Sequence, residues 1–285
     1  MSESEYREAS REQWGDAAAK WARKAEEEEI GASADTTVWM LGAADPQPGQ
    51  QVLELACGAG RVGLQVAPRV GSTGTVLCSD FSEAMVEAVA QRVERHAVSN
   101  VSARVLNAEE LDLPDEAAFD LVLCRFGYML MADPARALRE SARALRPGGR
   151  LVLAVWGAAE KNPWLSLILK AVMRHLDAPP PEPGTPGPFS LGDPERLREL
   201  LDQAGLEDVE IGEIETKQAY ASLPGWWDEI LEVSGPLAAM LGALPEDDRE
   251  KIRADALGAA GDFLAADGEA VFPAAVVGAT ARKPA

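Results

Sequence analysis

The sequence predicts an α/β fold, with a doubly wound, mostly parallel sheet of seven strands and an added helical cap. From residue 51 to residue 156, strand-like apolar runs alternate with helix-like patterns, as in a parallel sheet with helices on both faces. Two further strand-like stretches, 209–216 and 270–281, bring the predicted strands to seven. The residues between those two stretches look helical and would form the cap. In folds of this kind, ligands bind at the carboxyl ends of the strands.

Each predicted core strand is a short apolar run bounded by turn-forming residues. These runs lie at residues 51–56, 75–79, 101–106, 120–124 and 150–156. Cap residues mark the helix starts. Ser82 precedes apolar residues at helical spacing, and both Asp133-Pro134 and Asp193-Pro194 combine an Asp cap with Pro at the first helical position.

The chain divides into four parts along the sequence. The first part looks helical, and its Trp14 and Trp21 lie seven residues apart on one face, either as core packing or as a lid over a ligand. A proline-rich run at 179–188 excludes regular structure. We therefore expect an N-terminal helical lid (1–45), a ligand-binding core (46–157), a helix with a proline-rich flap (158–192), and the end of the core sheet (193–285) with a cap inserted at about 222–268.

Composition narrows the class of protein. The 285 residues are 47% hydrophobic, but no apolar stretch reaches the roughly 18 residues that span a bilayer. The first residues lack a signal-sequence pattern, so we expect a cytoplasmic protein without membrane insertion. A net charge of −20 argues against nucleic acid, which requires basic residues, and favours a small-molecule substrate. Cys57, Cys78 and Cys124 lack metal-ligand spacing, so we expect buried free thiols and no metal site. No pattern indicates an oligomeric state.

The stretch Q-V-L-E-L-A-C-G-A-G-R-V-G at residues 51–63 carries the strongest chemical signal. Small residues at 58–60 allow a sharp turn and leave backbone N–H groups at a helix start, where a ligand can approach. Glu54 places a carboxylate at the end of a buried strand, which is costly unless it meets a cation or donors. Residues 58–63 also satisfy the dinucleotide fingerprint, with Asp80 about 20 residues further on. Because the Glu54 carboxylate would repel a pyrophosphate and attract an ammonium group, the charges favour S-adenosylmethionine (SAM).

Further motifs follow at the ends of the predicted strands. With E-L-A-C-G-A-G at 54–60 they are D-F-S at 80–82, N-A-E at 107–109, F-D-L-V at 119–122 and L-R-P-G-G-R-L at 145–151. Together, over about the first 157 residues, they resemble the class I SAM-dependent methyltransferases of the ubiquinone/menaquinone C-methyltransferase-like branch (methyltransferase type 11/25). Asn107 stands where an aspartate is more usual. Residues 124–128 differ from the quinone enzymes' signature, so the quinone substrate does not carry over.

The resemblance implies a SAM site, with S-adenosyl-L-homocysteine as product. It places Glu54 and the turn at the methionine end, Asp80 at the ribose, and Asn107-Ala108 at the adenine. Several of these residues keep a structural alternative: a helix-start charge for Asp80, core packing for Met85 and a turn for Asn107. The complete predicted cofactor-binding set is Glu54, Ala56, Cys57, Gly58, Gly60, Asp80, Phe81, Met85, Asn107, Ala108, Glu109 and Arg125.

Aromatic residues after the fourth and fifth strands suggest where the acceptor binds. Tyr128, Trp156 and Trp164 would line an acceptor pocket, although packing between cap and core explains the tryptophans equally well. Tyr128 and His175 are candidate bases, but no catalytic residue is assigned. We expect a SAM-dependent methyltransferase acting on a small, largely apolar or aromatic metabolite, with the O-, C- or N-acceptor open. The alternatives are an NAD(P)-dependent oxidoreductase and a non-catalytic SAM-binding protein.

Overall fold

A computed structural model describes residues 2–27, 30–113, 118–182 and 184–285 of the chain. Pro183 of the predicted flap lies outside these ranges.

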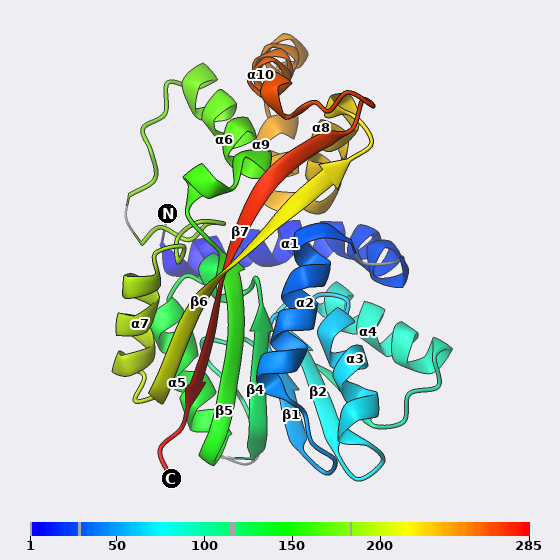
Figure 1. Cartoon of the computed structure of the whole chain (residues 1–285), viewed down its shortest axis with the longest axis vertical. Coiled ribbons are helices and arrows are strands. Elements are labelled where there is room, and N and C mark those ends of the chain that lie inside the picture. Colours follow the sequence, from blue (N-terminus) through cyan, green and yellow to red (C-terminus); the bar gives the residue numbers. More distant parts are fainter. Residues whose placement is uncertain (1, 28–29, 114–117, 183) are drawn as a thin grey trace.

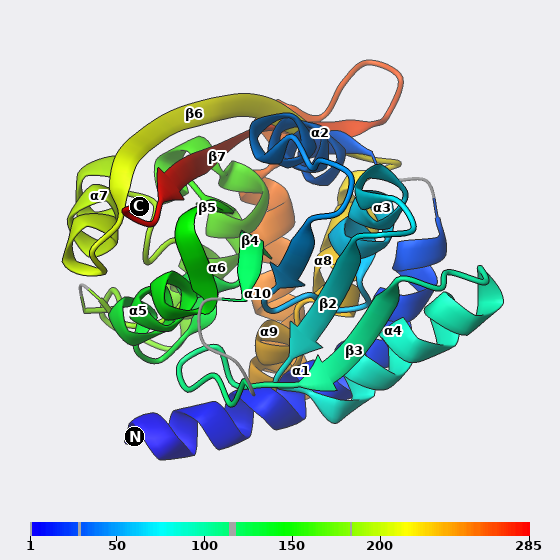
Figure 2. The same ribbon diagram turned by 90° about the horizontal axis from the view of Figure 1, so that it is seen from below.

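The described residues form one sheet of seven strands in the order β3-β2-β1-β4-β5-β7-β6 (Figures 1 and 2). Neighbours from β3 to β5 pair in parallel, whereas β7 is antiparallel to both β5 and β6. The predicted fold class is therefore confirmed. The strand order reverses between β1 and β4, which makes this junction the topological switch point. The strands are β1 (Gln51–Glu54), β2 (Thr75–Asp80), β3 (Val101–Val105), β4 (Phe119–Arg125), β5 (Leu145–Trp156), β6 (Glu207–Tyr220) and β7 (Ala270–Arg282).

Helices cover the sheet and extend the fold beyond it. In the view of Figure 1, α2 crosses in front of the sheet and α5 lies behind it. The helices are α1 (Glu3–Glu26), α2 (Gly31–Ala44), α3 (Arg61–Val70), α4 (Glu83–Arg95), α5 (Pro134–Ala144), α6 (Pro163–His175), α7 (Pro194–Gln203), α8 (Leu223–Val233), α9 (Gly235–Gly242) and α10 (Glu246–Ala259). Short 3₁₀ turns are η1 (Tyr128–Leu130), η2 (Ala159–Lys161) and η3 (Gly261–Phe263). Among the described residues, no helix combines the length and the apolar character needed to cross a membrane.

The predicted N-cap residues lie at the starts of their helices. Ser82 accepts a hydrogen bond from the Met85 N–H at the start of α4, and Asp133 accepts one from the Arg136 N–H at the start of α5. β5 differs from its prediction, because it begins at Leu145 rather than at residue 150. The Gly148 N–H donates to the Lys283 carbonyl, so the residues before 150 also take part in the strand pairing.

Strands β6 and β7 extend past the parallel strands as a two-stranded ribbon (Figure 1). Helices α8, α9 and α10 gather with α6 around the far end of this ribbon and form the cap. Trp226 of α8 and Phe272 of β7 are fully buried there, with ring centroids 4.9 Å apart. The cap residues therefore continue the hydrophobic core of the sheet beyond the parallel strands.

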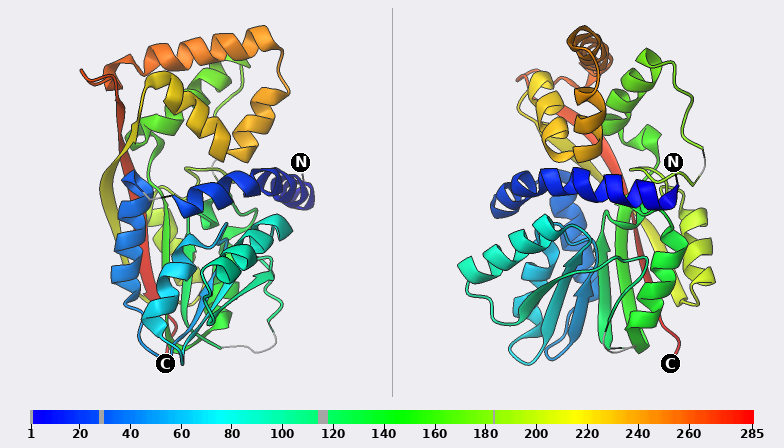
Figure 3. Two further views of the ribbon diagram at one scale, coloured as in Figure 1. Left: turned by 90° about the vertical axis from the view of Figure 1, so that its right-hand side faces the viewer. Right: turned by 180° about the vertical axis from the view of Figure 1, so that it is seen from behind.

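Helix α1 lies between the sheet and the cap (Figures 1 and 3). On the cap side, the Trp21 Nε1–H donates to the Val233 carbonyl at 3.1 Å. A Cβ at Gly235 would collide with the Gln13 carbonyl oxygen, so glycine allows α9 to begin this close to α1. On the sheet side, the Tyr6 hydroxyl donates to the Leu130 carbonyl at 2.9 Å. Helix α1 thus spans the carboxyl edge of the strands.

Candidate cofactor-binding site

The loops after β1 and β4 meet at the switch point, and each carries a residue in the left-handed region. Ala56 has a φ of 48° and Phe126 a φ of 59°. For residues with a Cβ this conformation is strained, and such strain concentrates at functional sites. A Cβ on Gly127 would lie 2.6 Å from the Ala56 Cβ, so glycine lets the two loops touch. The surrounding fold imposes this geometry where a doubly wound sheet binds its ligand.

The glycine loop (residues 58–60) turns the chain from β1 into α3. Gly58 and Gly60 have φ values of 53° and 74°, which favour glycine. A Cβ on Gly60 would lie 3.0 Å from Val89 of α4, whereas a Cβ on Gly58 would meet open space. Gly60 therefore serves packing, and Gly58 leaves room next to the backbone for a ligand.

Glu54 ends β1 with only 2% of its surface exposed. Its Oε2 accepts hydrogen bonds from the Gly63 N–H at 2.8 Å and from the Cys78 thiol at 3.4 Å. Burial raises the pKa of Glu54 to about 7, although these two donors and the positive charge of Arg125 counteract the shift. A carboxylate has about four acceptor positions, so capacity remains for a cationic ligand.

Asp80 ends β2 and holds the glycine loop from the side. Its Oδ2 accepts from the Gly58 N–H at 2.9 Å and its Oδ1 from the Ser82 N–H at 3.0 Å. Burial raises the pKa of Asp80, and these N–H groups counteract the shift. The two bonds leave acceptor positions for two hydroxyl groups, as in a ribose diol. Asp80 also supports the start of α4, because its Oδ1 accepts from the N–H of Ser82, the N-cap residue of that helix.

Apolar groups follow Asp80 after β2, and an amide follows β3. Met85 is 3% exposed within α4, and Phe81 is half-buried before this helix. Asn107 is exposed after β3, and its Oδ1 accepts from the Glu109 N–H at 3.0 Å in a tight turn. The side-chain amide of Asn107 is therefore oriented by the turn, and Ala108 is buried beside it.

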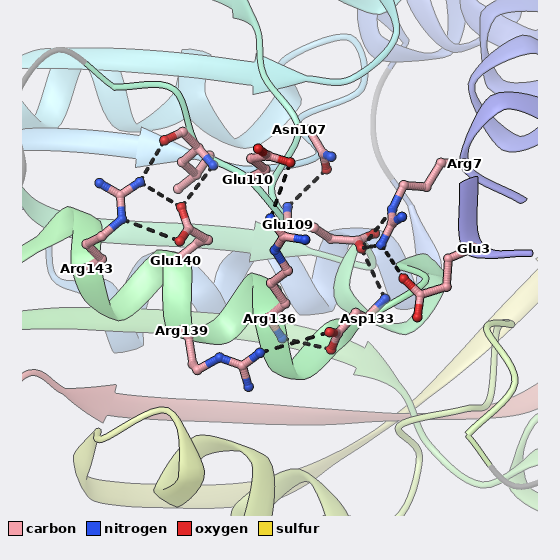
Figure 4. A network of polar contacts seen from close by, with 11 residues as sticks. Glu3, Arg7, Asn107, Glu109, Glu110, Asp133, Arg136, Arg139, Glu140 and Arg143 are labelled. Carbon is pink, nitrogen blue, oxygen red and sulfur yellow. Dashed lines mark hydrogen bonds and ion pairs between the residues drawn. The ribbon is translucent and has the colours of Figure 1, made fainter. Parts of the chain in front are cut away.

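Glu109 is held by the protein itself, because both its oxygens accept hydrogen bonds from other parts of the chain (Figure 4). The Arg7 Nε–H of α1 donates to Oε2 at 2.9 Å. The Ala132 N–H donates to Oε1 at 3.0 Å, and the Asp133 N–H donates to Oε2 at 3.2 Å. Glu109 thus joins α1, the loop after β3 and the start of α5, and its contact with a cofactor stays a prediction.

Arg125, at the end of β4, is directed toward α2. Its Nη1 donates to the Thr37 hydroxyl at 2.7 Å and to the Ser33 carbonyl at 3.2 Å. Arg125 also lies over the Phe126 ring at 5.8 Å. It therefore anchors the second helix to the site, and its positive charge reaches Glu54 electrostatically.

Three aromatic rings stack next to the switch point. The ring centroids of Phe126 and Trp156 lie 4.2 Å apart in parallel, and those of Trp156 and Trp164 lie 4.7 Å apart edge to face. Tyr128 is excluded from this group. It is fully buried, its hydroxyl lies 2.6 Å from the Ser141 Oγ, and burial raises its pKa well above the usual value. Tyr128 therefore packs α5 against the sheet, and these surroundings do not support its predicted role as an acceptor contact or base.

The remaining predicted groups have structural surroundings. His175 lies in the cap, with its Nε2 3.4 Å from the Asp248 Oδ1, and among the described residues no contact links it to the switch point. Cys57, Cys78 and Cys124 are buried free thiols. The described residues contain no group of three or more His, Cys, Asp or Glu side chains placed to hold a metal ion.

Sequence reasoning missed three arginines that tie α1 to the site: Arg7, Arg61 and Arg92. Each binds at least one residue more than 30 positions away. Arg92 occupies a helix whose apolar pattern was recognised, but no local pattern distinguishes it from the exposed Arg95 three positions on. Burial is the distinguishing property, and it follows from the tertiary fold.

The sheet order, the glycine loop at its switch point and the carboxylate after β2 define a Rossmann-like methyltransferase fold. A family model described as "Methyltransferase domain" matches residues 52–149. The ubiquinone/menaquinone biosynthesis C-methyltransferase UbiE of Proteus mirabilis (strain HI4320) is 33% identical over 171 residues, which cover 56% of this chain and 67% of that protein. The chain therefore belongs to the class I SAM-dependent methyltransferase family, in its ubiquinone/menaquinone C-methyltransferase-like branch.

Other relatives with the same printed name match over shorter lengths. Three of them are 37–40% identical over 106 to 108 residues, and the matches cover only 42–43% of their own length.

Solved structures of low sequence identity share the fold. The YcgJ protein of Bacillus subtilis is 19% identical with a TM-score of 0.60, and the match covers 88% of this chain and 98% of that one. Phosphoethanolamine N-methyltransferase 2 of Haemonchus contortus, in complex with phosphomonomethylethanolamine and S-adenosylhomocysteine, is 20% identical with a TM-score of 0.56. That match covers 88% of this chain and 53% of the other.

Proposed function

We propose that this chain binds SAM at the β1–β4 switch point and transfers its methyl group to a small, largely apolar or aromatic acceptor. The observation that carries the proposal is the pair of buried carboxylates, Glu54 and Asp80, on either side of a glycine loop. Membership of the family supports it, and so does the S-adenosylhomocysteine bound to a protein of the same fold.

The charges of the site favour SAM over a dinucleotide. A pyrophosphate in the glycine loop would meet the buried Glu54 carboxylate, with little water to screen the repulsion. An ammonium group would stabilise the ionised form of Glu54, whose pKa of about 7 lies close to neutral pH. The Asp80 carboxylate suits the two hydroxyls of a ribose. These preferences argue against the NAD(P)-dependent alternative.

Catalysis in this site would depend on alignment and on exclusion of water. Bound SAM would supply a methyl group on a positively charged sulfur. The bond from the methyl carbon to sulfur would break as the bond to the acceptor forms, with S-adenosylhomocysteine as the leaving group, and an O–H, N–H or C–H acceptor would also have to lose a proton. Helix α1 and the cap lie over the strand ends, where they would keep water from the reacting groups. We assign no base, because Tyr128 is buried against Ser141 and His175 lies in the cap.

The aromatic stack supports an apolar or aromatic acceptor. Phe126 is held in a strained conformation after β4, and Trp156 and Trp164 extend the stack toward the cap. Flat rings of this kind pair with aromatic ligands in offset or edge-to-face arrangements. The name of the Proteus relative specifies carbon methylation in quinone biosynthesis. Because residues 124–128 depart from the signature of those enzymes, we do not extend the quinone to this chain.

Calorimetric titration tests the cofactor. We expect S-adenosylhomocysteine to bind, and NAD(H) and NADP(H) to show no binding. Replacing Asp80 by Ala should weaken S-adenosylhomocysteine binding about ten-fold or more, because charge-assisted hydrogen bonds contribute about 1.5–3 kcal/mol. Glu83→Gln, at the exposed start of the following helix α4, is the matched control and should leave the affinity unchanged. Binding of a nicotinamide dinucleotide alone would overturn the proposal.

A separate experiment distinguishes an enzyme from a non-catalytic SAM-binding protein. Methyl-labelled SAM is incubated with the chain and a broad panel of apolar and aromatic acceptors. We expect label in at least one acceptor class. Tight SAM binding without transfer to any acceptor would favour a binding role instead.

A further inference from the structure

The last turn of α1 is held against the core by two arginines. The final carbonyls of a helix lack partners within the helix, and the negative end of the helix dipole attracts cations there. Arg61, directly after the glycine loop, donates to the Lys24 carbonyl and, at 3.1 Å, to the Glu27 carbonyl. Arg92 of α4 donates to the Ala25 carbonyl at 2.9 Å. Side chains from the core thus cap the C-terminal end of α1.

Arg92 also contacts the glycine loop itself. Its side chain is about nine-tenths buried. Its Nη1 donates to the carbonyl of Ala59, the middle residue of the glycine loop, at 2.6 Å, and its Nε donates to the Glu26 carboxylate at 3.0 Å. The planar guanidinium presents donors in fixed directions, which lets one side chain bind three separate acceptors. A single guanidinium therefore joins α4, the glycine loop and α1.

The other end of α1 is attached to a second loop of the candidate site. Arg7 binds Glu109, which directly follows Asn107 and Ala108 on the loop after β3 (Figure 4). The cap packs on the opposite side of the same helix (Figure 3). Helix α1 therefore connects the two loops that would hold the methionine and adenine ends of SAM.

We propose that Arg92 is a positioning residue for SAM binding: its guanidinium holds the glycine loop in its ligand-binding shape by linking the Ala59 carbonyl to the docked end of α1. This inference rests on the proposed function of the same site. It implies that ligand binding and the docking of α1 stabilise each other, because each orders the loop on which the other depends. Loss of the guanidinium would weaken ligand binding without removing any group predicted to touch the ligand.

The test combines affinity with hydrogen exchange. S-adenosylhomocysteine binding is measured by calorimetry for the wild type, Arg92→Gln, Arg92→Lys and Arg95→Gln. Arg95 is the matched control, because it lies on the same helix and binds the same Glu26 carboxylate at 3.1 Å, but it is exposed and does not reach the glycine loop. Amide exchange in residues 13–26 of α1 is then followed with and without the ligand.

We expect the ligand to slow exchange in α1 of the wild type and of Arg95→Gln, whose affinities should be similar. Arg92→Gln should bind about ten-fold or more weakly and lose the ligand-induced slowing. Arg92→Lys keeps the positive charge but not the planar guanidinium with its several donors, so its affinity should fall between those of the wild type and Arg92→Gln. Unchanged affinity in Arg92→Gln would overturn the proposal, and so would ligand binding to the wild type without slower exchange in α1. If Arg92→Gln does not fold, Arg92→Lys and the wild-type exchange decide. Failure of the wild type to bind the ligand would refute the proposed function itself.

Discussion

The buried carboxyl of Glu54 should destabilise the ligand-free fold at neutral and alkaline pH. Burial raises its pKa from 4.5 to about 7. Because one pKa unit corresponds to about 1.4 kcal/mol, ionising Glu54 in the folded state costs about 3 kcal/mol. Between these two pKa values the folded state binds more protons than the unfolded state. This tighter proton binding stabilises the folded state. The stabilisation is complete below pH 4.5, decreases as the pH rises toward 7 and is lost above pH 7.

The substitution Glu54→Gln removes this titration and keeps an oxygen that can accept from the Gly63 N–H. Free energies of unfolding in urea are compared for the ligand-free wild type and variant at pH 5 and pH 8. Any effect of the amide that does not depend on pH is the same at both pH values, so it cancels when the two pH values are compared. The titration of all other groups is the same in both proteins, so it cancels when the variant is compared with the wild type. We expect the variant to gain about 2–3 kcal/mol relative to the wild type from pH 5 to pH 8. An equal difference at both pH values would refute the argument.

Three further results are expected. Between pH 6 and pH 8, the wild-type affinity for S-adenosylhomocysteine should rise about ten-fold as Glu54 ionises, and this rise should be absent in Glu54→Gln; parallel pH profiles would contradict the ammonium contact. Tyr128→Phe should retain methyl transfer and lose about 1 kcal/mol of stability in urea unfolding, because the hydroxyl binds Ser141 and not a substrate; loss of turnover would restore Tyr128 as a catalytic candidate. Gly63→Ala should lower the free energy of unfolding by about 1–3 kcal/mol, because its Cβ would lie 2.6 Å from the Glu54 Oε2 and even closer to the Cys78 sulfur; unchanged stability would contradict this packing.

Local signals predicted much of the fold. The helix N-cap residues Ser82 and Asp133 each bind a backbone N–H three positions on, so the sequence alone places the starts of α4 and α5. The apolar runs likewise predict the parallel strands, because both faces of such strands are buried. The early start of β5 was not predictable, because it depends on pairing between Gly148 and Lys283, far apart in the chain.

In the candidate site, too, some residues were predictable from the local sequence and others depend on tertiary contacts. The glycine loop, Glu54 and Asp80 lie within 27 residues of one another, and the chemistry of a strand-to-helix turn identifies them. Glu109 was assigned to the cofactor because it follows the motif Asn107-Ala108. Its partner in the structure, Arg7, is 102 residues away, and a contact of that separation leaves no local pattern. Which carboxylates remain available to a ligand thus depends on the tertiary fold.

A crystal structure with S-adenosylhomocysteine tests the central claim most directly. We expect the ligand's amino group within hydrogen-bonding distance of Glu54 and both ribose hydroxyls on Asp80, beneath the docked α1. A ligand bound elsewhere on the chain, or a dinucleotide whose diphosphate fills the glycine loop, would contradict the account.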